Sequence, residues 1–378
     1  TPCVRVLCAV ALGLLAGLVC LPDPVGACAV APPQGVVVEV ASESAVIVWD
    51  EKAKTEHFIR RATFQPVASV GGPVVVKDFG FLVPTPSIPA LGEVPDAAFD
   101  DLAKLTEPKT VYEKRSSGGG GCALGCGMMG AKSQAPAEFG ERHAVQIVAE
   151  KHVAGYDAKV IKADDADALT AWLKDHGYET RPALAGWLQP YLDKKWVVTA
   201  FKIGREPSQQ ANGPIGSTAV RMSFTTDKPF YPYREPADAR DAKTRRLLRV
   251  FFIGPQKVAG ELDGKGAWDA KTVWAGKPGA DGLGVGAPGW KGALATLKVP
   301  GFEPTADTWL TEFEDPSSPR KGDADVFFGP AGSDAPVERP ARVIYVSRAD
   351  GAAPFAGVGV AVACLYLTRF FAAWRRRA

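Results

Sequence analysis

Ala163–Tyr178, with the sequence ADDADALTAWLKDHGY, carries the clearest local signal in this chain of 378 residues. Asp164 precedes apolar residues at helical spacing, including Leu169 and Trp172, and acidic side chains in the first turn complement the helix dipole. Gly177 fits the position just after the last turn. The stretch therefore predicts an amphipathic helix with Asp164 as its N-cap. Capping also accounts for the neighbouring carboxylates, which could otherwise suggest acid–base chemistry.

Strand patterns surround this helix. Residues 143–153 and 156–163 alternate in polarity and predict one hairpin, and 45–49 with 57–64 predict another. We therefore expect an α+β fold, a mostly antiparallel β-sheet ectodomain with a few short helices, plus an N-terminal signal peptide and one C-terminal transmembrane helix. Further strands are expected at 36–40, 74–83, 196–203, 247–253 and 257–262, helices at 95–107 and 182–192, and a long surface loop at 276–292.

The N-terminus has the layout of a secretory signal. Arg5 precedes an apolar run from Val6 to Cys20, and small residues follow a proline pair. The run is short for a membrane anchor, so we expect residues 1–27 to be removed by cleavage after Ala27, or after Ala29. The alternative is that Cys28 is lipidated, because the residues before it resemble a lipobox.

The C-terminus predicts a membrane span. Eighteen uncharged positions separate Asp350 from Arg369, which reaches the lower length limit for a transmembrane helix. Aromatic residues and Arg375–Arg377 follow, so we expect a helix at 352–374 and a cytoplasmic tail at 375–378. The protein is then a single-pass cell-membrane protein whose ectodomain faces the periplasm or the cell surface. A sorting tail that is removed by processing has the same pattern.

Composition and charge describe the remainder. Residues 28–115 form an N-terminal β-rich part, 116–138 a Gly/Cys-rich flexible loop, 139–330 a central α+β part, and 331–351 a linker. Between Cys28 and Asp350 there are 39 basic and 41 acidic residues, so no single-sign field remains to hold phosphate backbones. Nucleic acid is therefore not an expected partner.

Three cysteines remain between the signal and the tail. In an oxidising compartment Cys122 and Cys126 are expected to form a disulfide, or one of them pairs with Cys28. The alternative is a soft-metal site for Cu(I), with Cys122, Cys126 and His143 as ligands and two methionines nearby. Two cysteines cannot complete a structural zinc site, and we expect no cofactor if the disulfide forms.

Five stretches spread over most of the ectodomain carry a family resemblance. They are FGFLVPTPSIP (Phe79–Pro89), YDAKVIKADDADALTAWLKDHGYE (Tyr156–Glu179), LQPYLDKKWVVTAFKI (Leu188–Ile203), MSFTTDKPFYPYRE (Met222–Glu235) and TWLTEFE (Thr308–Glu314). Together they resemble the bacterial family known as domain of unknown function 2330. The resemblance implies a secreted or membrane-tethered protein and carries over no catalytic residues.

Two classes of function remain open. The first is a noncatalytic binding or structural module of the bacterial envelope, with a protein or an envelope polymer as partner. The second is a copper-binding protein or an envelope enzyme, although the sequence has no GxSxG or HExxH motif. Four tryptophans could stack on sugar rings, but buried anchoring is the commoner role of Trp. They are Trp268, Trp274, Trp290 and Trp309.

Overall fold

The computed structural model describes residues 30–31, 37–67, 79–114, 145–178, 180–203, 215–216, 218–240, 247–278 and 289–346. These residues form an α+β structure with mostly antiparallel sheets, as predicted. The chain divides into two compact units, the first made of 1–107 with 127–339 and the second of 108–126 with 340–378. Within the described ranges no helix has the length and apolar character needed to cross a membrane. The predicted signal peptide and the predicted transmembrane helix lie outside those ranges.

The large sheet of the first unit has eight described strands. In order across the sheet they are β16 (Lys271–Gly276), β17 (Trp309–Asp315), β13 (Leu247–Gly254), β2 (Val37–Asp50), β3 (Thr55–Val67), β11 (Ala219–Thr225) and β5 (Ala90–Val94), with β10 (Ile215–Gly216) beside β3. Ala45 and Ile47 of β2 point to one face and Val46 and Val48 to the other, and all four are fully buried. Strand β2 is therefore central. It pairs antiparallel with β3, as the predicted hairpin requires, and parallel with β13.

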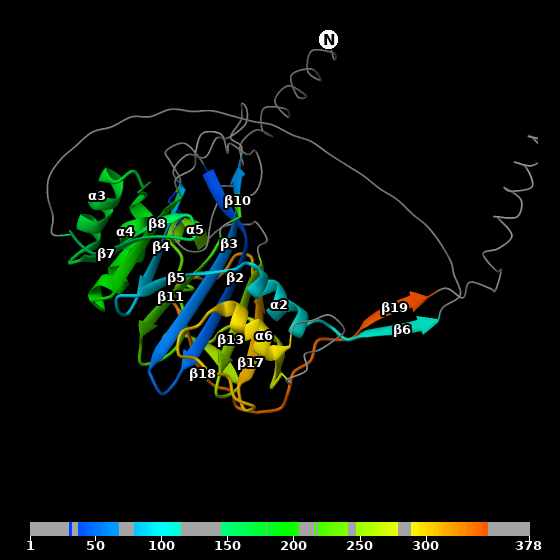
Figure 1. Ribbon diagram of the computed structural model, residues 1–378. Helices are drawn as coiled ribbons and strands as arrows, with labels where there is room; N and C mark the ends of the chain where they lie inside the picture. The colour runs from blue at the N-terminus through cyan, green and yellow to red at the C-terminus, as the bar shows by residue number, and fades with distance from the viewer. Residues whose placement is uncertain are drawn as a thin grey trace, which may run out of the picture. The chain divides into compact units, whose positions relative to one another are not determined.

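Two helices, α2 (Ala97–Leu105) and α6 (Trp290–Leu297), cover one face of the large sheet (Figure 1). Phe99 and Leu102 of α2 and Leu294 of α6 pack in one apolar cluster with Val46 and Val48 of the sheet. Helix α2 matches the helix expected at 95–107. Helix α6 begins inside the expected surface loop at 276–292, so that part of the prediction was wrong.

The five-stranded sheet carries the remaining long helices. Its strands are β1 (Val30–Ala31), β4 (Phe79–Thr85), β9 (Val197–Ile203), β8 (Tyr156–Ala163) and β7 (Val145–Val153), and α3 (Ala166–Asp175) and α4 (Pro182–Asp193) pack on one face. Leu169 and Leu173 of α3 are fully buried there, as the helical spacing predicts. The N-cap is Asp165 rather than Asp164, because the Asp165 carboxylate accepts a 2.7 Å hydrogen bond from the Ala168 backbone N–H.

A four-stranded sheet completes the core of the first unit. Its strands are β12 (Phe230–Tyr231), β18 (Val326–Pro330), β14 (Val258–Leu262) and β15 (Gly266–Ala267), and the short helix α5 (Ala237–Arg240) follows β12. Side chains from all three sheets meet in one aromatic cluster, in which Phe81 stacks on Phe201 with ring centroids 4.7 Å apart. The first unit is thus layered as α2 and α6, the large sheet, the two smaller sheets, and α3 with α4 (Figure 1).

The second unit contains a parallel two-stranded ribbon, β6 (Thr110–Lys114) with β19 (Arg342–Val346). Tyr112 lies opposite Ile344 in its register, and the Arg342 backbone N–H donates to the Lys109 carbonyl over 2.8 Å. We call this unit the ribbon.

Candidate functional site

The residues predicted to bind copper or form a disulfide lie outside the described ranges. This holds for Cys28, Cys122, Cys126 and His143. Within the described residues there is no group of three or more His, Cys, Asp or Glu side chains that could hold a metal ion. The copper site and the disulfide therefore stay predictions.

The other three histidines have structural surroundings. His57 is buried in β3 with its Nδ1 2.8 Å from the Ser223 hydroxyl, and burial together with the Arg221 charge lowers its pKa to about 4. His152 is exposed and lies 2.9 Å from Asp157, and His176 stacks on Trp172 at the end of α3. The contacts of His152 and His176 are local, whereas His57 joins β3 to β11 through Ser223.

The four tryptophans that could have formed a sugar-binding platform are buried instead. The exposed fractions are 7% for Trp268, 8% for Trp274, 4% for Trp290 and 8% for Trp309. Trp268 packs against Phe313 and Phe328 in the core of the first unit, while Trp274 of β16 and Trp290 of α6 belong to the apolar cluster between the helices and the large sheet. The commoner role of Trp as a buried anchor is the one observed.

A surface groove opens at the turn between β2 and β3, and it is the candidate ligand site of the first unit. Its volume is about 280 Å³. Four segments converge on it: the β2–β3 hairpin end at 49–54, the loop at 227–229, the β13–β14 turn at 255–258, and β18 at 327–330. We call it the groove.

Local hydrogen bonds fix the walls of the groove. Asp50 Oδ1 accepts from the backbone N–H groups of Lys52 and Ala53, each over 3.0 Å, which explains why the polar run after β2 forms a tight turn. The Lys54 carbonyl then accepts from the Thr226 N–H over 2.9 Å and joins this turn to the 227–229 loop. Two of the converging segments are therefore held together by the backbone.

The groove has an aromatic floor and a rim of mixed charge. Trp49 and Phe252 in its floor are almost fully buried, and Lys54 Nζ lies 5.8 Å from the Trp49 ring centroid. This ammonium already covers the indole, so a flat ligand must displace it to stack there. The charged rim residues are all exposed: Glu51, Lys54, Asp227, Lys228 and Glu261.

A network of buried charges lies between the sheets, and the sequence analysis did not predict it. Arg60 Nε is 2.6 Å from Glu43 Oε1, both side chains are about 1% exposed, and the Arg60 guanidinium sits 4.8 Å from the Phe81 ring centroid. Arg320 lies 3.6 Å from Asp315 and 3.8 Å from Glu235, again with almost no exposure. Alternation in β2 and β3 could have placed Glu43 and Arg60 on one face, but no sequence signal brings Arg320 there.

The charges of this network stabilise one another. Burial alone would raise the pKa of Glu43, but the charge and hydrogen bond of Arg60 outweigh it and the pKa is lowered. Burial likewise opposes ionisation of Asp315, yet hydrogen bonds from Ser317 and Tyr233 and the charge of Arg320 lower its pKa. These groups are enclosed and paired with one another, so they do not face a ligand.

Glu56 is the exception among the buried acids. Its Oε2 accepts from the Phe230 N–H over 2.9 Å, and its Oε1 has no hydrogen-bond partner among the described residues. Burial raises the pKa of Glu56 well above its ordinary value. Burial therefore favours the protonated form of Glu56 more in the folded protein than in water. Glu56 lies opposite Trp49 across β2 and β3.

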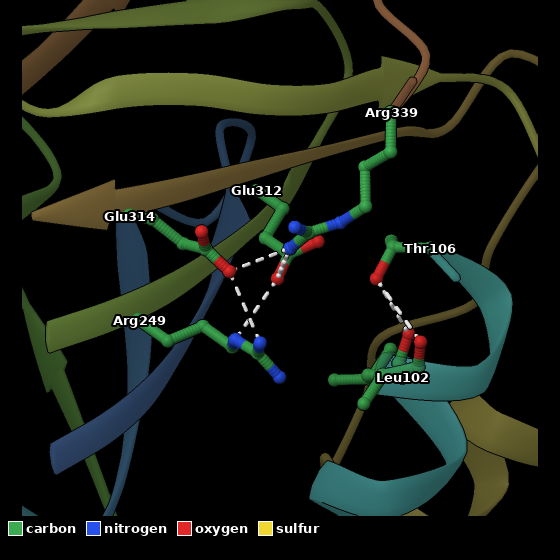
Figure 2. A network of polar contacts seen from close by, with 7 residues as sticks. Leu102, Thr106, Arg249, Glu312, Glu314 and Arg339 are labelled. Atoms are coloured by element: carbon green, nitrogen blue, oxygen red, sulfur yellow. Dashed lines mark hydrogen bonds and ion pairs between the residues drawn. The ribbon is translucent and has the colours of Figure 1, made fainter. Parts of the chain in front are cut away.

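A second ionic cluster fastens the chain that leads to the C-terminus. Residues 331–339, which we call the strap, meet β16 at a single bridge, where Val337 and Ala275 exchange two backbone hydrogen bonds of 2.8 Å. At the end of the strap, Arg339 Nη2 lies 2.7 Å from both Glu312 and Glu314 of β17. Arg249 of β13 approaches the same two carboxylates from the other side, at 3.1 and 3.0 Å (Figure 2).

The two carboxylates of this cluster differ in environment. Glu312 is fully buried, and burial raises its pKa although the Thr106 hydroxyl, Arg339 and Arg249 act to lower it. Glu314 is only half-buried, and there the two arginines outweigh burial and lower the pKa. The arrangement is an arginine clamp on a carboxylate pair. It joins the strap to the sheet.

The described fold and these sites define an α+β protein with mostly antiparallel sheets, a small surface groove and a clamped C-terminal strap. The chain belongs to the family described as "Uncharacterized protein conserved in bacteria (DUF2330)", whose sequence model matches residues 24–286. No curated protein matches the chain. A crystal structure of baculovirus P35 is similar at 11% identity and a TM-score of 0.30, covering 65% of this chain and 78% of that one. A likeness this weak carries no argument about fold or function.

Proposed function

We propose that this protein is a membrane-anchored, extracytoplasmic binding module of the bacterial envelope and that it works without catalysis. Membership of a family conserved in bacteria supports a bacterial protein. The signal-like start and the uncharged run before Arg369 support export and anchoring. The groove supports binding.

The groove is the single observation that carries the binding role. Its volume of about 280 Å³ lies near the lower end of the range for small-ligand pockets, roughly 300 Å³. Its floor is apolar and its rim is charged. In small-ligand sites the apolar surface usually supplies most of the affinity, and the polar groups fix the orientation of the ligand. A small ligand, or one unit of a polymer, fits this size.

The rim points to a ligand that carries both signs of charge. Lys54 and Lys228 can pair with carboxylates, while Glu51, Asp227 and Glu261 can pair with amino groups. Units of an envelope polymer that combine a sugar with a short peptide have both groups. Such a unit would place its apolar face on the aromatic floor after displacing Lys54 from Trp49.

Ligand-observed NMR with N-acetylmuramyl-L-alanyl-D-isoglutaminyl-L-lysine, which has both carboxylate and amino groups, tests this role, with N-acetylglucosamine as the uncharged comparison. We expect line broadening of the muramyl tripeptide by the wild-type protein and about fivefold weaker binding to Lys228→Ala, equal to roughly 1 kcal/mol for one exposed charge pair. Lys291→Ala, an exposed lysine on α6, is the matched control and should bind normally. Equal binding by Lys228→Ala and wild type, or no broadening by either, would reject the groove as the binding site.

Anchoring is tested separately on the full chain in a bacterial host. We expect the protein to stay in the membrane pellet after carbonate extraction, with residues 28–350 accessible to added protease in spheroplasts. Mass spectrometry of the mature C-terminus should then contain Arg375–Arg377. Extraction of the intact chain by carbonate, or a mature end before residue 351, would refute permanent anchoring.

A further inference from the structure

The ribbon leaves apolar side chains exposed on both of its faces. Because paired residues of a parallel ribbon point to the same side, Tyr112 and Ile344 share one face, and Val111, Val343 and Tyr345 share the other. Their exposed fractions run from 38% for Ile344 to 67% for Tyr112. Parallel strands are normally covered on both faces, and an isolated two-stranded ribbon is marginal in water. The ribbon therefore needs a further surface to be stable.

Basic residues are frequent in the sequence of the two strands and beside them. Lys109 and Arg342 are exposed at the start of the two strands. The sequence adds Lys114 and Arg115 at the end of β6 and Arg348 after β19, against the acids Glu113 and Asp350. Clustered lysine and arginine beside tyrosine, valine and isoleucine is the composition of a segment that lies on an anionic lipid surface.

The direction of the strands points to the same surface. Lys114 lies opposite Val346, so the chain leaves both strands at the same end of the ribbon. The uncharged run of the tail starts at Gly351, five residues after Val346. Five extended residues reach at most about 18 Å. A tail that enters a bilayer at this point keeps the ribbon within reach of the lipid headgroups.

We propose that the ribbon lies on the surface of an anionic phospholipid bilayer, with the face of Tyr112, Ile344 and Arg342 toward the lipid and Tyr112 at the boundary between water and lipid. This proposal rests on the membrane anchoring proposed above. Tyrosine is enriched at that boundary because its ring is apolar and its hydroxyl is polar. Arg342 contacts lipid phosphates, and the lipid covers the face that carries Tyr112 and Ile344. The ribbon then acts as a second contact that fixes the stalk of the ectodomain on the membrane.

Photocrosslinking of the full chain identifies what covers the ribbon. Tyr112 is replaced by p-benzoylphenylalanine, and the protein is reconstituted in vesicles of phosphatidylglycerol and phosphatidylethanolamine. Flotation reports anchoring by the tail, and mass spectrometry reports the crosslinked partner. Ile88→p-benzoylphenylalanine is the matched control, because Ile88 is 54% exposed and lies in the first unit.

We expect a lipid adduct at position 112 and none at position 88. In an Arg342→Gln background the adduct should fall about fivefold, the effect of one basic residue near an anionic surface. Phosphatidylcholine vesicles should lower it further, because they remove the attraction of every basic residue. A protein–protein adduct at position 112 would overturn the proposal in favour of a second copy of the chain. A floating protein without a lipid adduct would also overturn it but leave the anchor intact, whereas failure to float would refute the anchor itself.

Discussion

Replacement of Arg339 by methionine tests the clamp that fastens the strap to the large sheet. The change removes two contacts of 2.7 Å, one to fully buried Glu312 and one to half-buried Glu314. A hydrogen bond to a buried charge contributes about 1.5–3 kcal/mol, and a partly exposed pair contributes roughly 0.5 kcal/mol. Because Arg249 still neutralises Glu312, we expect Arg339→Met to lower the free energy of unfolding by about 2–3 kcal/mol.

Two measurements separate local from global effects of this change. Thermal unfolding should show a midpoint lower by about 3–5 °C if the whole first unit is destabilised, since the shift per kcal/mol falls with the size of the unit. If only the strap opens, backbone hydrogen exchange at residues 331–339 should accelerate roughly 30- to 150-fold. This factor is the increase in the equilibrium constant for opening that corresponds to a loss of about 2–3 kcal/mol.

The effect of Arg339→Met on the free energy of unfolding should also depend on pH. Glu312 already has a raised pKa, so loss of Arg339 should raise it further, and the destabilisation should shrink as the pH falls and Glu312 becomes neutral. Lys277→Met is the control, since it removes an exposed ion pair with Asp307 and should change little. Unchanged unfolding and unchanged strap exchange in Arg339→Met would show that the clamp does not hold the strap.

Three further outcomes are expected. The unfolded chain takes up a proton at His57 more readily than the folded protein, so the free energy of unfolding falls as the pH drops from 6.5 toward 4. In His57→Asn this decrease, measured by urea unfolding, should be smaller by roughly 1 kcal/mol. An unchanged dependence on pH would contradict the lowered pKa of His57. Because the pKa of Glu56 is raised in the folded protein, the free energy of unfolding should decrease as the pH rises above 4.5. Glu56→Gln removes this loss, so its stability relative to wild type should increase with pH. Parallel plots of unfolding free energy against pH for the two proteins would show that Glu56 is ionised in the core. Gly80→Ala should cost about 1–3 kcal/mol because a Cβ there would lie 2.7 Å from the Tyr178 ring, whereas Gly186→Ala in α4 meets nothing within 4 Å and should be neutral or stabilising in the same denaturation assay.

Local patterns in the sequence predicted local elements well. The helix of 163–178 and the β2–β3 hairpin follow from capping residues, apolar spacing and a polar turn, all of which act over a few residues. Helix α6 was missed because its first residues lie next to a glycine-rich stretch and the helix has no side-chain cap. Its burial under the large sheet, rather than local propensity, stabilises it.

Long-range pairings could not be predicted in the same way. Arg339 comes from a stretch expected to be a linker, and only the folded sheet places it beside Glu312 and Glu314. Arg320 reaches the core of the first unit from a loop for the same reason. The groove also depends on four separate segments, and no single one has a recognisable binding motif. The alternation of apolar and polar residues predicted which side chains of a strand are buried. Which strands pair, and which side chains meet across the sheets, depends on the topology of the whole fold.

The parallel pairing of β2 with β13 has a consequence for how the protein folds. Strand β2 meets residues about 200 positions later in the chain, since Ser42 lies opposite Leu247. Contacts between such distant residues slow folding, because the intervening chain must be ordered before they form. Until β13 arrives, one edge of the β2–β3 hairpin is open to wrong partners. The chain thus has to leave the ribosome, and any export channel, for most of its length before its largest sheet can exist.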